Sequence, residues 1–205
     1  MITEDHPYFF IEQIASDNKD AKFHLSKYKY TPDSLLDERE VLTVASGEFT
    51  QTWVDHQLSL LRNDQELALH SSVTIKNRTY HVPMIDFAFS TEPSPRVLDR
   101  IHALLFKSVF LTLNFYETGR SFHAYSTSLM TPSEWLEFMG RLLLVNPKGD
   151  RDAIVDTRWV GHRLISGYCS LRWSNNSGQY LRMPRLVGNP ATLRAPSRAR
   201  LQRVG

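Results

Sequence analysis

The fold is decided by one stretch, residues 109–127, which reads VFLTLNFYETGRSFHAYST. Residues 109–115 are mostly aromatic, aliphatic or β-branched and predict a strand. Residues 117–120 predict a turn, because a glycine stands there among polar side chains. Residues 121–127 are expected to form the antiparallel partner of the first strand. The stretch therefore predicts a β-hairpin with a polar tip.

A helix is expected directly after this hairpin. Thr131 is a favourable N-cap, Pro132 suits the first helical position, and Glu134 stands three residues after the cap. Apolar residues then recur at the spacing of one helix face until Pro147 stops the helix. This is the strongest helix start in the chain.

Further patterns predict more strands and two more helices. Residues 66–75 and 79–89 are β-rich runs joined by a turn at Asn77 and Arg78, which predicts a second hairpin. The other expected elements are a helix at residues 50–61, a helix at residues 97–105 and a strand at residues 168–173. The fold class that follows is α+β, an antiparallel-rich sheet with flanking helices.

The sequence patterns divide the chain into three parts. Residues 1–60 are expected to form an N-terminal extension packed on the core, residues 61–188 the main domain, and residues 189–205 an arginine-rich C-terminal tail. The boundaries follow the change from irregular to strand-rich patterning and then to a basic end.

The composition is typical of a globular protein and excludes several classes. The 205 residues are 41% hydrophobic and 22% charged, which excludes a disordered or fibrous chain. The longest apolar runs are far shorter than the roughly 20 residues of a membrane-spanning helix, so no membrane association is expected. No secretory signal is expected, because acidic residues stand near the N-terminus. The single cysteine, Cys169, cannot form an internal disulfide and indicates a cytoplasmic protein.

The formal net charge of +2 conceals an uneven distribution. Residues 1–150 hold 14 Lys and Arg against 20 Asp and Glu, whereas residues 151–205 hold 10 against 2. All ten of these C-terminal basic residues are arginines, whose planar fork suits phosphate oxygens and nucleobases. A phosphate-bearing partner is expected. The alternative for the last arginines, residues 194–203, is a solvated tail.

Polar groups follow apolar runs at three places. Asp86 follows residues 82–85, Asp156 follows residues 153–155, and His123 lies at the hairpin tip after Gly119-Arg120-Ser121-Phe122. A carboxylate at a strand end can bind a hard divalent cation through oxygen. Two such carboxylates with a histidine and arginines are the components of phosphoryl-transfer chemistry.

These segments resemble the motifs of the archaeo-eukaryotic primase superfamily, which includes primases and primase-polymerases. The first family motif is a hydrophobic strand ending in Asp-x-Asp, which residues 84–86 resemble. The second is Ser-x-His, commonly preceded by Gly-Arg, which residues 119–123 resemble. The third is a hydrophobic strand ending in one Asp, like residues 154–156, and a basic segment like residues 170–175 follows it. The resemblance covers residues 80–185 and implies a primase-like, RRM-like catalytic core.

The resemblance implies a role for each matched residue. Asp86 and Asp156 would bind catalytic Mg²⁺ or Mn²⁺ and, with His123, would form the catalytic set. The residues that would bind a nucleoside triphosphate are Arg120, Ser121, His123 and Arg172. Arg158 joins Arg172 as an expected contact to DNA or RNA, because both stand among apolar and aromatic residues of the basic end. The implied activity is metal-dependent nucleotidyl transfer by a DNA or RNA primase-polymerase, and family habits suggest a separate helicase or nuclease partner.

One departure from the family pattern opens an alternative function. The second aspartate of the first motif should stand at position 88, where this chain has Ala88. Glu92 or Glu117 could replace it only if a loop brings one of them close. The alternative is a catalytically inactive primase-like module that binds nucleic acid or assembles a larger genome-maintenance or defence complex. A third possibility is a structural partner protein whose primase-like fold is a relic.

Each candidate residue also has a purely structural interpretation. Asp86 could bond a neighbouring turn, and Asp156 could cap a following helix. His123 could be a satisfied strand histidine, and Arg172 could face solvent. The aromatic residues of the basic end, Trp159, Tyr168 and Trp173, could stack on bases, although core packing is expected for at least two of them. Cys169 is expected to be an inert core thiol rather than a nucleophile.

Overall fold

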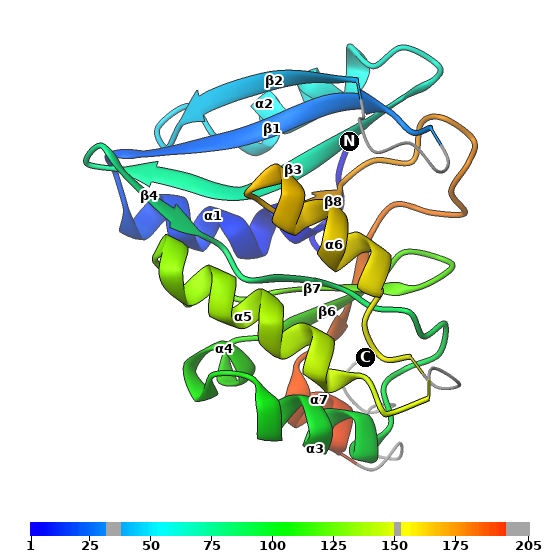
Figure 1. Cartoon of the computed structure of the whole chain (residues 1–205). Coiled ribbons are helices and arrows are strands. Elements are labelled where there is room, and N and C mark those ends of the chain that lie inside the picture. The colour runs from blue at the N-terminus through cyan, green and yellow to red at the C-terminus, as the bar shows by residue number, and fades with distance from the viewer. Residues whose placement is uncertain (32–37, 150–152, 196–205) are drawn as a thin grey trace.

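The computed structural model describes residues 1–31, 38–149 and 153–195. It confirms an α+β fold in which antiparallel strands form two sheets (Figure 1). The strands are β1 (Ala21–Lys29), β2 (Arg39–Ala45), β3 (Gln65–Ile75), β4 (Arg78–His81), β5 (Met84–Asp86), β6 (Asn114–Glu117), β7 (Phe122–Tyr125), β8 (Ser170–Arg172) and β9 (Arg185–Gly188). The helices are α1 (Pro7–Asp17), α2 (Gln51–Ser59), α3 (Pro95–Leu104), α4 (Lys107–Leu111), α5 (Pro132–Val145), α6 (Thr157–Ser166) and α7 (Pro190–Arg194).

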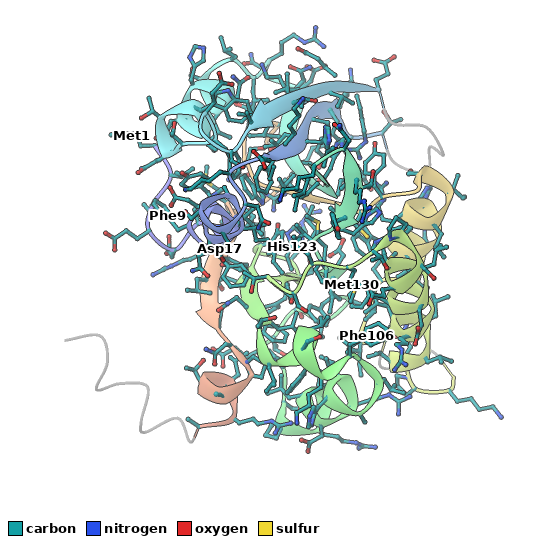
Figure 2. The ribbon with its side chains drawn as sticks, turned by 90° about the vertical axis from the view of Figure 1, so that its left-hand side faces the viewer. Met1, Phe9, Asp17, Phe106, His123 and Met130 are labelled. Atoms are coloured by element: carbon teal, nitrogen blue, oxygen red, sulfur yellow. The ribbon has the colours of Figure 1, made fainter. Side chains whose placement is uncertain are left out.

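The first sheet has the strand order β2-β1-β3-β4, and β8 also pairs with β3. The second sheet has the order β5-β7-β6-β9. In Figure 1 the first sheet lies above the second, and α5 and α6 lie on one side of both. Figure 2 places His123, on β7, at the centre of the molecule between the two sheets. The site described below lies in this region.

Local signals predicted several of these elements correctly. The hairpin after residue 113 is observed as β6 and β7, with Glu117 opposite Phe122. The predicted hairpin is observed as β3 and β4, but it turns through Lys76 and Asn77, which both have positive φ angles, and Arg78 of the predicted turn belongs to β4. The capping box at the start of α5 is complete, because Thr131 and Glu134 each accept a hydrogen bond from the other's backbone.

The predicted strand at residues 109–115 is wrong in its first half. Residues 107–111 form α4, and only the end of the predicted strand belongs to β6. Val109, Phe110 and Leu113 are buried, and their spacing of one and three residues also fits one face of a helix. Phe110 stacks on His102 of α3 with ring centroids 4.5 Å apart. Packing against α3 therefore decides a pattern that local composition leaves ambiguous.

The β-rich run at residues 79–89 is divided between the two sheets. β4 ends at His81 in the first sheet, and β5 begins at Met84 in the second. Pro83 stands between them and cannot donate a hydrogen bond to a sheet ladder. This break carries the chain from one sheet to the other and delivers Asp86 to the space between them.

The N-terminal residues are part of the first sheet. β1 pairs with both β2 and β3 and is therefore an interior strand. The expected boundary at residue 60 falls within this sheet. α1, which the sequence pattern did not reveal, begins at Pro7 after His6, whose ring accepts a hydrogen bond from the backbone of Tyr8.

The two sheets are joined through a buried core. Trp173, directly after β8, is fully buried and donates from Nε1 to the hydroxyl of Tyr125 on β7 (3.1 Å). Its carbonyl lies 2.9 Å from Nε2 of His6. At the C-terminal end, α7 carries Arg194, which pairs with Asp99 (2.7 Å), whereas the predicted tail arginines beyond residue 195 lie outside the described residues. None of the helices in the described ranges is long and apolar enough to cross a membrane.

Candidate functional site

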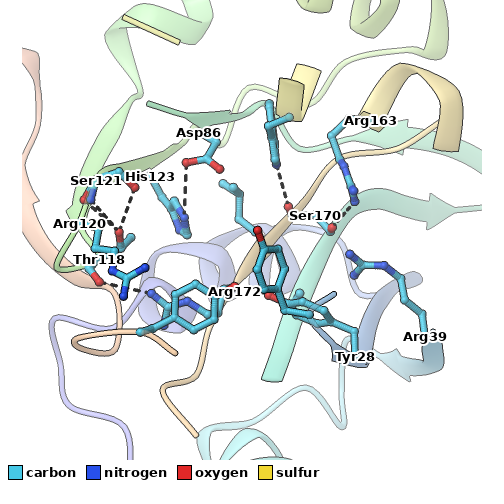
Figure 3. Close-up of a pocket in the computed structure, with 15 residues that line it drawn as sticks. Tyr28, Arg39, Asp86, Thr118, Arg120, Ser121, His123, Arg163, Ser170 and Arg172 are labelled. Carbon is cyan, nitrogen blue, oxygen red and sulfur yellow. Dashed lines mark hydrogen bonds and ion pairs between the residues drawn. The ribbon is translucent and has the colours of Figure 1, made fainter. Parts of the chain in front are cut away.

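A pocket of about 270 Å³ lies between the two sheets (Figure 3). Strands of both sheets, α6 and the turn between β6 and β7 contribute to its lining. Among the described residues, the lining combines a single carboxylic acid, Asp86, with His123, four aromatic side chains and four arginines, namely Arg39, Arg120, Arg163 and Arg172. Four guanidinium groups against one carboxyl group favour an anionic ligand.

The hairpin tip forms one end of this pocket. The hydroxyl of Thr118 donates to the carbonyl of Ser121 (3.0 Å), and the backbone N–H of Ser121 donates to the hydroxyl of Thr118 (3.3 Å). Gly119 has φ +98°, and a Cβ atom there would lie 2.6 Å from Cβ of Leu181. The turn therefore requires glycine. Arg120 is exposed, and within the described part of the chain no hydrogen bond or ion pair holds its guanidinium.

Asp86 and His123 face each other at the floor of the pocket. They are register partners on β5 and β7, and Oδ1 of Asp86 lies 3.8 Å from Nε2 of His123. Burial and the neighbouring charge of Asp156 raise the pKa of Asp86 to about 8. Burial lowers the pKa of His123 well below its usual value. At neutral pH the carboxyl group is mostly protonated and the imidazole is neutral, so the two side chains do not form an ion pair.

The imidazole of His123 has unused hydrogen-bonding capacity. It is buried, and its Nδ1 has no hydrogen-bond partner among the described residues. A buried polar atom without a partner is costly, and a bound ligand or water could satisfy it. His123 lines the pocket, and its role toward a nucleotide stays a prediction.

Asp156 has the capping role that the sequence offered as an alternative. Its Oδ1 accepts a hydrogen bond from the backbone N–H of Trp159 (3.0 Å) at the start of α6. It does not belong to the pocket lining. Its backbone N–H donates to the carbonyl of Asp86 (3.0 Å), so the two aspartates are close neighbours. The structure thus brings together Asp86, His123, Ser121, Arg120 and Arg172 and leaves Asp156 beside them.

The donor groups do not fit a metal centre built by the protein alone. Within residues 1–31, 38–149 and 153–195, no three His, Cys, Asp or Glu side chains are arranged to hold a metal ion. Ala88 is exposed and supplies a methyl group where the first family motif has a carboxylate. Neither Glu92 nor Glu117 lines the pocket, and Glu117 pairs with Arg182 (2.7 Å). Neither glutamate replaces the missing aspartate.

Arg172 is buried rather than solvent-facing and fastens a loop to the hairpin tip. Its guanidinium donates to the carbonyl oxygens of Ser174, Arg182 (3.1 Å) and Thr118 (3.4 Å). The ring of Tyr180 covers it, with Cζ 4.0 Å from the ring centroid. Arg172 therefore forms part of the pocket wall and supplies positive charge from a fixed position.

Glu66 holds the other side of the same loop, residues 174–182. It is fully buried at the start of β3. Its carboxylate accepts hydrogen bonds from the hydroxyl of Ser174, the backbone N–H of Asn176 (3.0 Å), and both the N–H (2.7 Å) and the hydroxyl (2.6 Å) of Ser177. These hydrogen bonds to one buried side chain hold the loop beside Arg172.

The other end of the pocket contains residues that the motifs did not identify. Arg163 donates from Nη1 to the hydroxyl of Ser170 (2.6 Å), and the indole N–H of Trp159 donates to the carbonyl of Ser170 (3.2 Å). Arg39 lies 4.5 Å above the ring of Tyr28. Arg163 follows Trp159 by four residues on α6, a spacing that could have linked them. For Arg39 no local signal exists, because sheet pairing brings it here.

The remaining candidates of the basic end have other surroundings. Arg158 is exposed on α6 and does not line the pocket. Tyr168 stacks on His70 (4.4 Å), and Trp173 is a core residue, so only Trp159 of the three aromatic candidates lies in the pocket. Cys169 is buried and its pKa is raised to about 12 by burial, as expected for an inert core thiol.

The family comparison agrees with the resemblance that the sequence motifs suggested. No curated protein matches the chain. Among solved structures, the catalytic domain of the primase Repb′ in complex with initiator DNA is similar, with 9% sequence identity, 96% coverage of both chains and a TM-score of 0.48. The family described as archaeo-eukaryotic primase 1D-like matches residues 45–185, which include all the pocket residues except Tyr28, Tyr30 and Arg39. Because this match spans more than half of the sequence, the chain belongs to the archaeo-eukaryotic primase family.

Proposed function

We propose that the pocket between the two sheets binds the phosphates of a nucleoside triphosphate and a segment of nucleic acid. The observation that carries the proposal is the meeting of four arginines in one pocket whose described lining holds a single carboxyl group, that of Asp86. The family supports the ligand class, because primases act on nucleotides and nucleic acid strands. Nucleic-acid-related nucleotidyl transfer is the chemistry of this family.

The hairpin tip is the proposed phosphate subsite. Arg120 is exposed at the tip, and Ser121 adds a hydroxyl group. Guanidinium groups bind phosphate oxygens in pairs, which gives both affinity and orientation. Arg172 contributes charge from the wall, and His123 offers a neutral imidazole nitrogen from the floor. Protonation of Asp86 removes a negative charge that would otherwise repel a phosphate.

ATP binding to variants of the hairpin tip tests the proposal. We expect Arg120→Gln to weaken ATP binding by about tenfold to a hundredfold, since hydrogen bonds to charged groups contribute about 1.5–3 kcal/mol. Arg78→Gln is the matched control, because Arg78 is exposed on β4 and does not line the pocket. Titration calorimetry at low salt measures both. Equal affinity of wild type, Arg120→Gln and Arg78→Gln would place the nucleotide elsewhere.

Metal-dependent nucleotidyl transfer is a second candidate function. The proximity of Asp86 and Asp156 favours it: the backbone N–H of Asp156 donates to the carbonyl of Asp86, the charge of Asp156 acts on the Asp86 carboxyl group, and carboxylates are typical ligands of a divalent cation. Ala88 favours the alternative of a binding module without transfer activity. In the transfer proposal Mg²⁺ or Mn²⁺ would act together with the bound nucleotide, and Asp86 and Asp156 would be its carboxylate ligands.

Primer extension distinguishes transfer from binding alone. Asp86→Asn preserves a neutral polar group in the floor, so the fold and ATP binding should be retained. If transfer occurs, wild type should extend a primer on a single-stranded template with Mn²⁺, and Asp86→Asn should not. Binding without any extension by wild type supports the binding module, and equal extension by both proteins excludes a role for the Asp86 carboxylate.

A further inference from the structure

β2 forms an outer edge of the first sheet. It pairs with β1 along all seven of its residues, Arg39–Ala45, and no other strand of the described chain pairs with its far side. Figure 1 shows β2 as the upper border of this sheet. A strand in this position presents a row of backbone N–H and C=O groups with which another strand can pair.

The register identifies the backbone groups of β2 that point away from the sheet. The N–H of Ser46 donates to the carbonyl of Ala21 (2.9 Å), so these two residues form a hydrogen-bonded pair. Such pairs alternate along an antiparallel ladder, so the even-numbered residues of β2 bond to β1. The odd-numbered residues therefore point their N–H and C=O groups outward. Within residues 1–31, 38–149 and 153–195, no hydrogen bond reaches the backbone groups of Val41 or Thr43.

The edges of β4, β5 and β9 are shorter and better protected than that of β2. These strands have four, three and four residues. Each is also covered in part by a backbone hydrogen bond to a neighbouring segment: from His81 to Met130 (2.8 Å), from Asp156 to Asp86 (3.0 Å) and from Leu186 to Asp5 (2.8 Å). Short length and covered edges prevent sheets from associating. β2 has neither protection.

The sequence of β2 favours pairing with another strand. Residues 41–45 read VLTVA, with three β-branched side chains and no charge, glycine or proline. Val41 is 56% exposed, and Leu42 is partly buried. The two charged residues of the strand, Arg39 and Glu40, stand together at one end. An uncharged segment of high β-propensity on an open edge is typical of a site of association.

A second copy of this chain fits the edge, because β2 is complementary to itself. A two-fold axis makes the two strands antiparallel, and the register that pairs all seven residues places the axis at Leu42. Val41 and Thr43 then lie opposite Thr43 and Val41 of the second copy, and each pair exchanges both of its N–H···O bonds. Leu42 packs against its own counterpart. Glu40 lies opposite Val44, so its charge meets no like charge.

We propose that β2 is the interface of a homodimer in which the first sheets of two copies join edge to edge. The surface goes beyond the proposed function, since neither Val41 nor Thr43 lines the pocket. An interface made by one strand from each copy is at the small end of specific interfaces. The dimer therefore forms reversibly, and its population rises with protein concentration.

Sedimentation velocity of the full chain at a series of concentrations tests the dimer. We expect the wild type to shift from monomer toward dimer as the concentration rises. Thr43→Pro removes an outward N–H and leaves the ladder with β1 intact, because an edge strand tolerates proline where the N–H faces solvent. Since a hydrogen bond is lost from each copy, the variant should dimerise about tenfold more weakly or worse.

Thr79→Pro is the matched control on the opposite edge of the same sheet. Thr79 is exposed on β4. The N–H of Val82 donates to the carbonyl of Ser71 (2.7 Å), so by alternation the N–H of Thr79 also points away from its ladder. Thr79→Pro makes the same chemical change at an edge outside the proposed interface, and it should dimerise as the wild type does.

Cysteine substitutions test the register without proline. Leu42→Cys places two thiols in a non-hydrogen-bonded pair, whose Cα atoms lie about 4.5 Å apart and suit a disulfide. Thr43→Cys places them two residues out of register, so their Cα atoms lie beyond the limit of about 7 Å. Under mild oxidation Leu42→Cys should form a covalent dimer, and Thr43→Cys should form little. Cys169 is buried, so the wild type should not cross-link.

The outcomes separate this interface from other possibilities. A wild type that stays monomeric at every concentration overturns the proposal and leaves the proposed function untouched. A dimer that Thr43→Pro and Thr79→Pro affect equally is built on another surface, and more cross-linking in Thr43→Cys than in Leu42→Cys contradicts the register. If Thr43→Pro does not fold, the two cysteine variants decide the question alone.

Discussion

Asp86 is an acidic side chain in a pocket that is proposed to bind phosphate. A carboxylate among phosphate ligands would repel them, but burial and Asp156 favour the protonated form of Asp86. His123 opposite it is neutral because burial disfavours the imidazolium. The floor of the pocket is therefore polar without being charged, and the arginines of the walls set the sign of the electrostatic potential.

Buried histidines make stability dependent on pH. Burial lowers the pKa of His6 and His81 to about 4 and, with smaller effects of nearby cations, that of His70 to about 3. In the unfolded chain the pKa of histidine is about 6.5. Between these values the unfolded state binds more protons, so the free energy of unfolding falls as the pH drops from about 6.5 to about 4. Each histidine contributes about 1.4 kcal/mol per pH unit in this window and nothing above it.

Replacement of one of these histidines tests the pH dependence. His81→Gln should reduce the slope of unfolding free energy against pH by about 1.4 kcal/mol per unit between about pH 4.5 and 6. Urea denaturation at a series of pH values measures this slope. The loss of stacking on Trp135 lowers stability at every pH and so leaves the slope unaffected. Identical slopes in the variant and the wild type would show that His81 is not buried in its neutral form.

Gly119 is the residue on which the hairpin tip depends. Gly119→Ala should destabilise the chain by about 1–3 kcal/mol, because the left-handed φ angle and the contact with Leu181 both oppose a Cβ atom. It should also weaken ATP binding by moving Arg120. Gly140→Ala is the control, since Gly140 lies in α5 with nothing within 4 Å of a new Cβ atom, and it should stabilise by up to about 1 kcal/mol. Denaturation and ATP titration of both variants check the difference, and similar behaviour would refute the role of the turn.

At the scale of elements, the loop at residues 174–182 depends on Glu66. Glu66→Gln keeps one carbonyl oxygen that can accept from the N–H groups of Asn176 and Ser177 but replaces the other carboxylate oxygen, which accepts from the hydroxyl of Ser174, by an NH2 donor. We expect the loop to loosen, because an unmade buried hydrogen bond costs about 1–3 kcal/mol. Hydrogen–deuterium exchange should increase in residues 174–182, and ATP affinity should fall as Tyr180 leaves the face of Arg172.

A matched carboxylate provides the control for this change. Glu137 on α5 pairs with Arg141 (2.6 Å) at the surface, so Glu137→Gln removes a carboxylate with little structural effect. In Glu137→Gln, hydrogen–deuterium exchange of residues 174–182 and the affinity for ATP should equal those of the wild type. If Glu66→Gln also exchanges like the wild type, the loop is held by contacts other than Glu66.

Elements with a local signal were predicted, and elements decided by packing were not. The start of α5 is encoded in four consecutive residues that cap the helix, so the sequence predicted it. α4 carries the composition of a strand and becomes a helix because Phe110 packs on His102. α1 escaped prediction because its capping residue, His6, is an unusual N-cap.

At the scale of the whole molecule, the site residues divide in the same way. Those that stand in local motifs were predicted, and those that packing brings together were not. The motifs predicted Asp86, Ser121 and His123, because each motif places its residue at a strand end or a turn. Arg39 was missed as a ligand candidate, and Arg163 was considered only as one of the ten C-terminal arginines for which a phosphate-bearing partner was expected. They approach one another only because β1 pairs with β2 and β3, and β3 pairs with β8 beside α6. No spacing in the sequence encodes this convergence.

The central claim is that phosphate binds between the two sheets at the hairpin tip. A crystal structure of the chain grown with ATP tests it most directly. The account predicts density for the triphosphate inside the pocket, within hydrogen-bond distance of Arg120 and Ser121. An ordered ATP molecule on another surface, with only water in the pocket, would contradict it.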